Sequence, residues 1–364
     1  MIMQIETIKS SIPLGISDPI PLWTKEYETQ LYLITKNECS MRGFGQILTS
    51  AMNLVSPYIS FVNAFAKCLV GKEEDEVQTL SNLMFKRSFN GGYGVITGAI
   101  GGIDISLWDL LSRSKKVSLS SYIGSSNRKV RRYVSLPRYK TVKDTINIIN
   151  KLYGNGYRKI KMHQDRLQSL EVIKYFYGLY DDLKIMVDLS CTLNEREAVE
   201  FMNEASKYEI EYVEEPVFPP DDYELLKQLN KLHPVAGGEN VYSKREFQYC
   251  IENEIFSVLQ PDLTKIGGVT KALEIMPLVK EAALPISFHS RPDSSWIQLA
   301  ASAQVASLFG DLGSVESPLN DIPKQYFDSE LIVDKDYIHI SGDGIGVSLK
   351  DRLPALNVRK TLVP

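Results

Sequence analysis

Ionisable residues recur at a nearly constant interval through residues 161–316 of this 364-residue chain. Each follows a short apolar run, and amphipathic stretches separate the runs. The residues are Lys161, Asp188, Glu214, Glu239, Asp262, His289 and Glu316, at intervals of 27, 26, 25, 23, 27 and 27 positions. In a parallel sheet, one strand and its following helix take roughly 25 residues. The spacing therefore predicts that one ionisable group ends each successive strand.

Eight such runs lie between residues 130 and 317. They are VRRYVSL, YRKIKMH, LKIMVDLS, IEYVEEP, HPVAGGEN, IFSVLQPD, PISFHS and LGSVES. Eight parallel strands with intervening helices form a TIM-type barrel, in which the carboxyl ends of all strands converge on one face and build the active site. We therefore expect the seven ionisable groups to share one mouth.

The residues before the barrel have a different pattern. Alternation at MQIETIKSS and LYLITKNECS predicts antiparallel strands, and two or three helices follow between residues 48 and 115. After the barrel, YIHISGDGIGVSL predicts two short strands around a glycine-rich turn. We expect an α+β domain over residues 1–125, the barrel over 126–325, and a segment over 326–364 that returns to the first domain.

The composition narrows the class of partner. A net charge of -4 and a pI near 5.8 give no basic field for a nucleic acid backbone, so nucleic acid is not an expected partner. The four cysteines show no CxxC spacing and are too few for a disulfide scaffold, which indicates a reducing cytoplasm. No signal peptide is expected, because MIMQIETIKSS lacks a basic start followed by an apolar run, and no membrane span is expected, because the longest apolar stretch contains Asp104.

Three carboxylates end three successive predicted strands. Taken singly, a strand-end carboxylate is more often a helix N-cap or a solvated charge than a ligand. Asp188, Glu214 and Glu239 in register would repel one another inside a pocket, and a divalent cation removes that repulsion. Carboxylate oxygens suit Mg²⁺, whereas zinc more often takes His or Cys.

The stretch YRKIKMH places Lys159, Lys161 and His163 on one face of a strand, because side chains alternate along it. We expect the two lysines to point inward beside the anionic site, where one of them can act as a base. On the other side of the barrel, Asp262 and His289 end neighbouring strands and can form an acid/base pair.

These motifs, in this order and spacing, resemble the enolase superfamily and specifically its mandelate racemase subgroup. They are KIK, VDLS, VEEP, GGEN, QPDLTKIGGVT, FHS and VES. The helix IDISLWDLL and the tail GDGIGVSL also resemble stretches of that family, so the resemblance covers nearly the whole chain. It implies a modified TIM barrel, (β/α)7β, with an N-terminal α+β capping domain, and assembly into a homo-oligomer.

The resemblance also implies a role for each site residue. Asp188, Glu214 and Glu239 would hold Mg²⁺, with Glu214 rather than Glu215 because the family's motif is Glu-X-Pro. Lys161 would take the base position, and Lys159 would help to stabilise the substrate carboxylate. The remaining assignments are the Asp262 and His289 dyad and a hydrogen bond from Glu316 to the carboxylate. Asp262 separates the chain from the cycloisomerases and dipeptide epimerases, which have lysine at that position.

The expected reaction is abstraction of a proton next to a carboxylate, followed by loss of the 3-hydroxyl from an aldonate or aldarate. This makes the chain an acid-sugar dehydratase that yields a 2-keto-3-deoxy acid. The alternative is a racemase or epimerase of a 2-hydroxy acid. Two other classes are a non-catalytic sugar-acid binding protein and a scaffold that the metal merely stabilises. Neither of these would need two acid/base groups.

Three features leave the substrate open. Ser190 stands where the family usually has asparagine, which alters contacts near the metal without removing a ligand. Substrate choice in the family depends on loops of the capping domain, here IPLGISDPIPLW and GFGQILTSAM. Arg291 can bind the distal carboxylate of a diacid, although a surface ion pair is the alternative.

Overall fold

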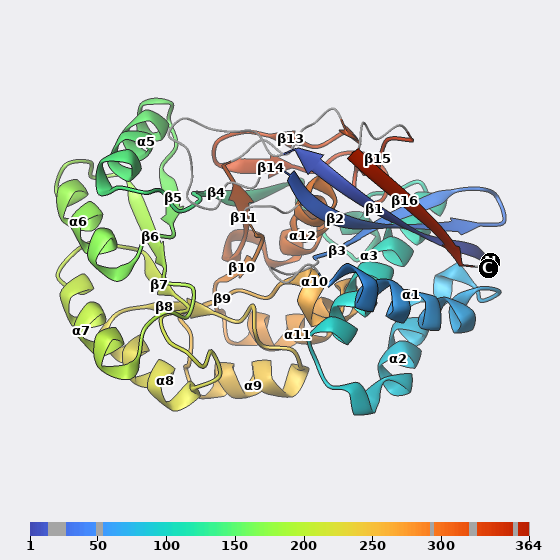
Figure 1. Cartoon of the computed structure of the whole chain (residues 1–364), viewed down its shortest axis with the longest axis horizontal. Helices are drawn as coiled ribbons and strands as arrows, with labels where there is room; N and C mark the ends of the chain where they lie inside the picture. The colour runs from blue at the N-terminus through green and yellow to red at the C-terminus, as the bar shows by residue number, and fades with distance from the viewer. Residues whose placement is uncertain (14–26, 49–53, 292–294, 320–325, 352–355, 364) are drawn as a thin grey trace.

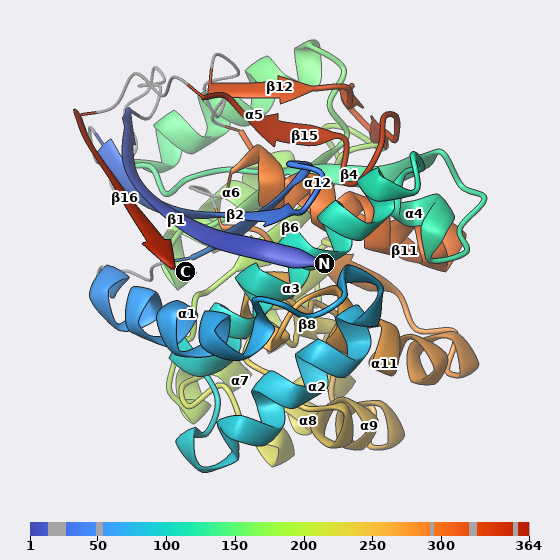
Figure 2. The same cartoon turned by 90° about the vertical axis from the view of Figure 1, so that its right-hand side faces the viewer.

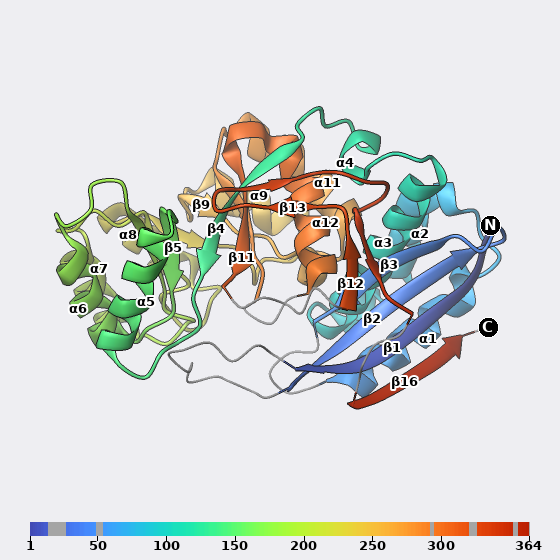
Figure 3. The same ribbon diagram turned by 90° about the horizontal axis from the view of Figure 1, so that it is seen from above.

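The computed structural model of the chain describes residues 1–13, 27–48, 54–291, 295–319, 326–351 and 356–363. Figure 1 shows two parts side by side: a barrel of strands ringed by helices, and a sheet backed by helices that is built mainly from the N-terminal residues. Figure 3 shows the same two parts from above.

Eight parallel strands form the barrel, and they follow one another around it in chain order. The last strand pairs with the first, which closes the sheet. They are β4 (Lys129–Ser135), β5 (Lys159–Met162), β6 (Lys184–Asp188), β7 (Tyr212–Glu214), β8 (Val235–Gly237), β9 (Val258–Leu259), β10 (Ile286–Phe288) and β11 (Gly313–Pro318). Each corresponds to one of the predicted runs, so the predicted (β/α)7β barrel is confirmed.

Helices make the seven connections between these strands. They are α5 (Val142–Gly154), α6 (Arg166–Phe176), α7 (Glu195–Ala205), α8 (Tyr223–Leu232), α9 (Lys244–Glu252), α10 (Leu263–Ile266) with α11 (Val269–Glu281), and α12 (Trp296–Ala306) with η3 (Ser307–Leu312). Their sequences explain their position. In α8, for example, Leu225 and Leu229 recur at helical spacing and are buried against the barrel, while polar residues lie on the opposite face.

The barrel interior is filled in layers. Tyr133, Met186, Tyr212 and Ala236 form a buried apolar cluster inside it. Because alternate residues of a strand share a face, the inward positions two residues beyond Met186 and Tyr212 are Asp188 and Glu214. The apolar cluster is therefore the floor beneath the ionisable groups of the mouth.

The N-terminal domain is an antiparallel sheet covered by helices (Figure 2). Its strands are β1 (Ile2–Pro13), β2 (Tyr27–Asn37) and β3 (Arg42–Ile47), with β16 (Leu356–Val363) added beside β1. Its helical elements are α1 (Val55–Leu69), η1 (Glu74–Glu76), α2 (Val77–Arg87), η2 (Phe89–Gly91), α3 (Val95–Ser114) and α4 (Leu119–Tyr122).

The interpretation of GFGQILTSAM as a loop is wrong in its first half. Arg42–Ile47 is strand β3, which pairs with β2 along six positions. Gly43 and Gly45 are what made this stretch resemble a loop, yet both are needed by the sheet. A Cβ at either position would lie 2.1 Å from a backbone oxygen of α3. Residues 49–52 of that stretch, and residues 14–23 of the other predicted loop, IPLGISDPIPLW, lie outside the described residues.

Four short strands follow the barrel. They are β12 (Phe327–Ser329), β13 (Ile332–Val333), β14 (Tyr337–His339) and β15 (Val347–Leu349). β14 adds to the barrel beside β4, whereas the backbone of Gly344 bonds to Val117 and Leu119 near the end of α3. The tail thus contacts both parts of the molecule. The domain boundaries at residues 125 and 325 stay predictions.

Helix α3 is the central helix of the N-terminal domain. It is long and apolar enough to cross a membrane by length and composition, but 89% of its apolar window is buried inside the protein. One side packs on β3, and the other packs on α10 and α11 of the barrel. Its burial is that of a core helix that joins the two domains.

Candidate active site

A cavity of about 370 Å³ opens at the carboxyl ends of the barrel strands. Both domains line it: Leu48 and Tyr58 come from the N-terminal domain, and the barrel supplies most of the ionisable groups. The barrel residues are His163, Asp188, Ser190, Cys191, Glu215, Glu239, Lys265, His289 and Arg291. Ionisable side chains therefore line the cavity on the barrel side, and partly apolar surface lines it on the side of the N-terminal domain.

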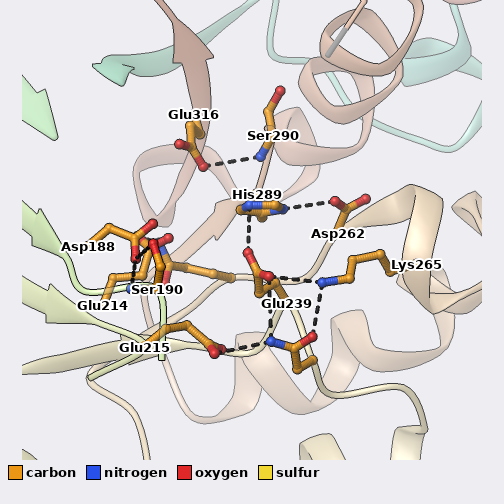
Figure 4. A network of polar contacts seen from close by, with 12 residues as sticks. Asp188, Ser190, Glu214, Glu215, Glu239, Asp262, Lys265, His289, Ser290 and Glu316 are labelled. Atoms are coloured by element: carbon orange, nitrogen blue, oxygen red, sulfur yellow. Dashed lines mark hydrogen bonds and ion pairs between the residues drawn. The ribbon is translucent and has the colours of Figure 1, made fainter. Parts of the chain in front are cut away.

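The predicted carboxylates lie close together at this mouth (Figure 4). Asp188 pairs directly with Glu214 in the register of β6 and β7. Oxygens of Glu214 and Glu239 and a ring nitrogen of His289 all lie within 4.8 Å of one another. Six of the seven regularly spaced ionisable groups lie together here. The seventh, Glu316, contacts this cluster through Lys161.

Lys161 lies beneath these carboxylates and is fully buried. Its Nζ is 2.6 Å from Glu214 Oε1, 2.8 Å from Glu316 Oε1 and 3.7 Å from Asp188 Oδ2. Burial would lower the pKa of this amine, but Glu214 and Glu316 hold the pKa well above its ordinary value. These two carboxylates thus favour the ammonium form of Lys161, which is not among the residues that line the cavity.

Lys159 is not brought to this cluster. Its Nζ is 2.9 Å from Glu211 Oε1, just before β7 begins, and its side chain is 43% exposed. Two residues along a strand span roughly 6.6 Å, so an inward lysine two positions before Lys161 lies toward the opposite end of the barrel. The shared face was predicted from alternation, but the height within the barrel was not.

His289 lies between two carboxylates (Figure 4). Its Nδ1 is 2.8 Å from Asp262 Oδ2 and its Nε2 is 2.6 Å from Glu239 Oε2. Burial alone would lower the pKa of the imidazole, but Glu239 and the hydrogen bond with Asp262 raise the pKa well above its ordinary value. The structure brings Asp262 and His289 together as a hydrogen-bonded pair.

Glu239 and Glu214 differ in their electrostatic surroundings. Burial opposes ionisation of Glu239, yet His289 and Lys265 hold its pKa well below the ordinary value. Burial raises the pKa of Glu214 well above its ordinary value, although Lys161 opposes this. A carboxylate that resists ionisation this strongly is stabilised by any further cation placed beside it.

His163 is a site residue that the regular spacing missed. Met162 pairs with Val187, so His163 follows at the level of Asp188, and its Nε2 is 3.0 Å from Asp188 Oδ2. Its Nδ1 is 2.6 Å from the carbonyl oxygen of Leu136. Because a carbonyl only accepts, Nδ1 carries the hydrogen, and Nε2 is the ring nitrogen that faces Asp188 at the cavity.

The signal for His163 was present in the sequence. The interval from His163 to Asp188 is 25 residues, the same as the interval from Glu214 to Glu239. Alternation along YRKIKMH also placed His163 on the inward face. The sequence did not show where the strand ends. The end of the strand decides which inward residue lies at the rim of the barrel.

Glu215 and Cys191 form a second layer on the cavity wall. Cys191 Sγ donates to Glu215 Oε2 at 2.7 Å, and Asn240 Nδ2 donates to the same oxygen at 3.1 Å. Burial, together with the negative charge of Glu239, raises the pKa of Glu215 to about 7. Ser190 donates its backbone N–H to Asp188 Oδ1 at 2.7 Å and so orients that carboxylate.

The donor set fits a hard divalent cation. Asp188, Glu214 and Glu239 offer oxygens from three neighbouring strands. Lys161 donates to Glu214 and the backbone N–H of Ser190 donates to Asp188, and these hydrogen bonds orient two of the three carboxylates. The nitrogen of His289 also falls within reach of Glu214 and Glu239, but Asp262 already fixes that ring. A set made mainly of carboxylates matches oxygen-preferring ions better than zinc.

Comparisons with known proteins place both parts of the chain in one family. Residues 147–353 match the family model described as "Enolase C-terminal domain-like". Residues 8–124 match that of the "Mandelate racemase / muconate lactonizing enzyme, N-terminal domain". Together these matches cover most of the barrel and the N-terminal domain, so the resemblance inferred from the motifs is confirmed.

Relatives and solved structures agree with this placement. The chain is 25% identical to an arabinonate dehydratase of Saccharolobus solfataricus over 309 residues, 80% of each protein. It is 30% identical to a putative L-rhamnonate dehydratase of Caldivirga maquilingensis over 61% of this chain and 55% of that protein.

Two solved structures share the fold. One is a 3,6-anhydro-D-galactonate cycloisomerase of Zobellia galactanivorans, with a TM-score of 0.83, 23% identity and 96% of both chains covered. The other is an L-talarate dehydratase of Polaromonas sp. JS666 complexed with Mg and L-glucarate, with a TM-score of 0.82, 20% identity and 99% of both chains covered. From its two matching domains, its closed barrel and its cluster of strand-end carboxylates, the chain belongs to the mandelate racemase/muconate lactonizing enzyme family of the enolase superfamily.

Proposed function

We propose that this chain is a Mg²⁺-dependent acid-sugar dehydratase that converts an aldonate or aldarate into a 2-keto-3-deoxy acid. The observation that carries the proposal is that two imidazoles, His163 and His289, line one cavity beside three carboxylates. In the closed barrel β5 and β10 are separated by β11 and β4 on the shorter path, so the two rings lie on nearly opposite sides. Dehydratases among the relatives support the same reaction class.

His289 is the proposed base. Asp262 Oδ2 accepts from Nδ1–H and stabilises the imidazolium that forms, so Nε2 takes the proton from the carbon next to the substrate carboxylate. The electron pair of the broken C–H bond then moves into the enediolate.

His163 is the proposed acid. Its Nδ1–H is fixed by the carbonyl of Leu136, and the imidazolium donates from Nε2 to the 3-hydroxyl as the C–O bond breaks. Water leaves, and the resulting enol tautomerises to the 2-keto-3-deoxy acid. This assignment gives His163 the acid/base position that the motif KIK suggested for Lys161.

Lys161 and Glu316 are the proposed electrostatic support. The buried ammonium of Lys161 lies between Glu214 and Glu316, where it offsets charge that develops on the enediolate. Its burial and its raised pKa favour this role over that of a base. Asp188, Glu214 and Glu239 are the proposed ligands of Mg²⁺, which when bound supplies a positive charge that stabilises the enediolate oxygens.

A racemase or epimerase is the alternative that the same geometry favours next. Two imidazoles on opposite sides of one carbon can remove a proton from one face and return it to the other. A racemase of Streptomyces coelicolor A3(2) with bound magnesium shares the fold at a TM-score of 0.82 and 20% identity.

Cytoplasmic location and homo-oligomeric assembly stay predictions.

The test is proton NMR in D₂O with Mg²⁺ on pooled aldonates, aldarates and simpler 2-hydroxy acids, repeated with a chelator. We expect loss of the α-proton signal and new methylene signals, both abolished by the chelator. Deuteration at the α-carbon without methylene signals would favour the racemase. Tight binding of an acid with no exchange at all would favour a non-catalytic binding protein, and loss of stability on chelation with no binding would favour a scaffold.

A further inference from the structure

The turn that carries Asp262 is short and depends on its neighbours. Asp262 is the N-cap of α10, a helix of only four residues. Its Oδ1 accepts from the N–H of Thr264 at 2.7 Å and from Thr264 Oγ1 at 2.6 Å, which leaves Oδ2 for His289. Gln298 of α12 also donates to Oδ1, at 3.2 Å, so the direction of the carboxylate toward His289 depends on α12 and on where α10 lies.

Helix α3 of the N-terminal domain sets the position of α10 from outside the barrel. Gly101 faces the turn so closely that a Cβ there would lie 2.9 Å from Leu263 O and 3.2 Å from Thr264 O. Gly98 approaches the same turn, with 3.4 Å from its ideal Cβ to Thr264 O. The backbone of α10 thus rests directly on the glycine face of α3.

Asp104, on the next turn of α3, supplies the cap that α11 lacks. The N-cap residue of α11 is Gly268, which has no side chain to accept from the free N–H groups. Asp104 Oδ1 accepts from the N–H of Thr270 at 3.0 Å, and Oδ2 accepts from Thr270 Oγ1 at 2.5 Å. Trp108 Nε1 donates to that hydroxyl at 2.9 Å.

The contact between Asp104 and the start of α11 requires glycine at position 268. Its φ is +94°, and an ideal Cβ would lie 2.3 Å from Asp104 Oδ1. Asp104 is fully buried, so the carboxylate contacts the helix terminus and not solvent. Gly267 and Gly268 join α10 to α11 directly, and fixing the start of α11 therefore fixes the end of α10.

We propose that Asp104 is a positioning residue for the Asp262 and His289 pair, acting from the N-terminal domain by capping α11 and seating α10 on α3. This inference rests on the proposed function only for the role of His289 as the base. A side-chain oxygen that accepts from the free N–H groups at a helix N-terminus stabilises that end of the helix, whether the carboxyl group is ionised or neutral. Displacement of a reacting group by about 1 Å can cost about 100-fold in rate.

Asp109 is a matched control on the same helix. It is also fully buried, but its carboxylate accepts from the N–H groups of Phe44 and Ile345 and from Arg113. It therefore ties α3 to the sheet and to the tail instead of to α10 and α11. Asp104→Ala and Asp109→Ala make the same chemical change in the same helix, and only the first removes the cap of α11.

The experiment combines kinetics with proton NMR of the full chain. The readout for position is the downfield proton that His289 Nδ1 shares with Asp262, assigned by its loss in His289→Asn. Asp104→Ala is expected to shift or broaden this resonance and to lower kcat by about 10-fold to 100-fold, with KM within about threefold. Asp104→Asn keeps one acceptor for Thr270 and is expected to restore both.

Gly101→Ala provides a second route that removes no hydrogen bond. Its Cβ must push the backbone of α10 away, so the same shift of the resonance and the same loss of kcat are expected. Asp109→Ala is expected to leave the resonance in place and kcat within about threefold of the parent. A resonance and a kcat that change equally in Asp104→Ala and Asp109→Ala, or in neither, would overturn the proposal. Should the parent chain turn over no sugar acid, the proposed function fails, while the resonance still decides this inference.

Discussion

The two histidines at the barrel mouth are held in different ways. His289 donates from Nδ1 to a carboxylate, Asp262, whereas His163 donates from Nδ1 to a neutral carbonyl, that of Leu136. On each ring Nε2 faces a carboxylate of the cluster, Glu239 or Asp188. A carboxylate stabilises an imidazolium more than a carbonyl does, and this difference supports the proposal that His289 is the base.

The two sides also differ in their outer support. The side of His289 is braced by the N-terminal domain, through α3 and the cap that Asp104 provides for α11. The side of His163 is braced within the barrel, because Leu136 directly follows β4, the strand beside β5. The position of His289 thus depends on how the two domains fit, whereas the contact of His163 with Leu136 lies within the barrel.

The largest effect is expected from His289→Asn. Asparagine can still bond to Asp262 but cannot accept the α-proton, so both deuterium exchange at the α-carbon and dehydration should fall by about 1,000-fold to 10,000-fold. Rates of exchange measured by proton NMR in D₂O, and of 2-keto acid formation, check this. Substantial exchange in the variant would assign the base to another residue.

Lys161→Met should have the next largest effect, a loss in the free energy of unfolding. Removing the ammonium leaves Glu214 and Glu316 buried beside each other without their partner, which costs about 3 to 5 kcal/mol. Urea unfolding measures the loss. Lys159→Met is the control: its partner Glu211 is partly exposed, so a change below about 1 kcal/mol is expected. Equal effects in the two variants would contradict the placement of Lys161 at the centre of the cluster.

Glu239→Gln should weaken Mg²⁺ binding about 100-fold, because a neutral amide replaces a charged oxygen. Calorimetric titration with Mg²⁺ alone gives the affinity without a substrate. The matched change Glu215→Gln alters a carboxylate on the same wall that is not a proposed ligand, and a change of only a few-fold is expected. The opposite ranking would move the metal to the side of Cys191 and Glu215.

The smallest expected effect is on how the free energy of unfolding depends on pH through Asp104, on the side of His289. Burial raises the pKa of Asp104 from 3.8 to about 7, against hydrogen bonds from Thr270. The folded-state pKa is thus above the unfolded value, so this group's stabilising contribution is complete below pH 3.8 and is lost as the pH rises through 7. Between pH 5 and pH 8 the loss is about 2.6 kcal/mol.

Urea unfolding of the parent and of Asp104→Asn at several pH values tests this. The stability of the parent relative to the variant should fall across that range, because asparagine does not titrate. A difference that stays constant from pH 5 to pH 8 would show that Asp104 is ionised throughout.

The barrel and most of the mouth could be predicted because each rests on local pattern. Short apolar runs at regular intervals define the strands, and a residue that ends a strand of a closed barrel must lie at its mouth. Asp262 and His289 follow neighbouring strands, so their contact followed from chain order. Seven ionisable groups at intervals of 23 to 27 residues were enough to predict that these groups lie together at the mouth.

What could not be predicted depended on register and on partners distant in sequence. Lys159, Lys161 and His163 share a face, but their heights in the barrel follow from the pairing of β5 with β6. The strand over Arg42–Ile47 was missed because its glycines are explained only by the approach of α3. The cap of α11 by Asp104 joins residues 166 positions apart and has no local signature.

The measurement that most directly tests the division of roles is proton NMR of His163→Asn with its sugar-acid substrate in D₂O and Mg²⁺. If His289 is the base and His163 the acid, the variant should exchange the α-proton for deuterium at a rate within about tenfold of the parent, while methylene signals of the 3-deoxy product fall by about 100-fold or more. Loss of exchange and dehydration together, or retention of both, would contradict this account.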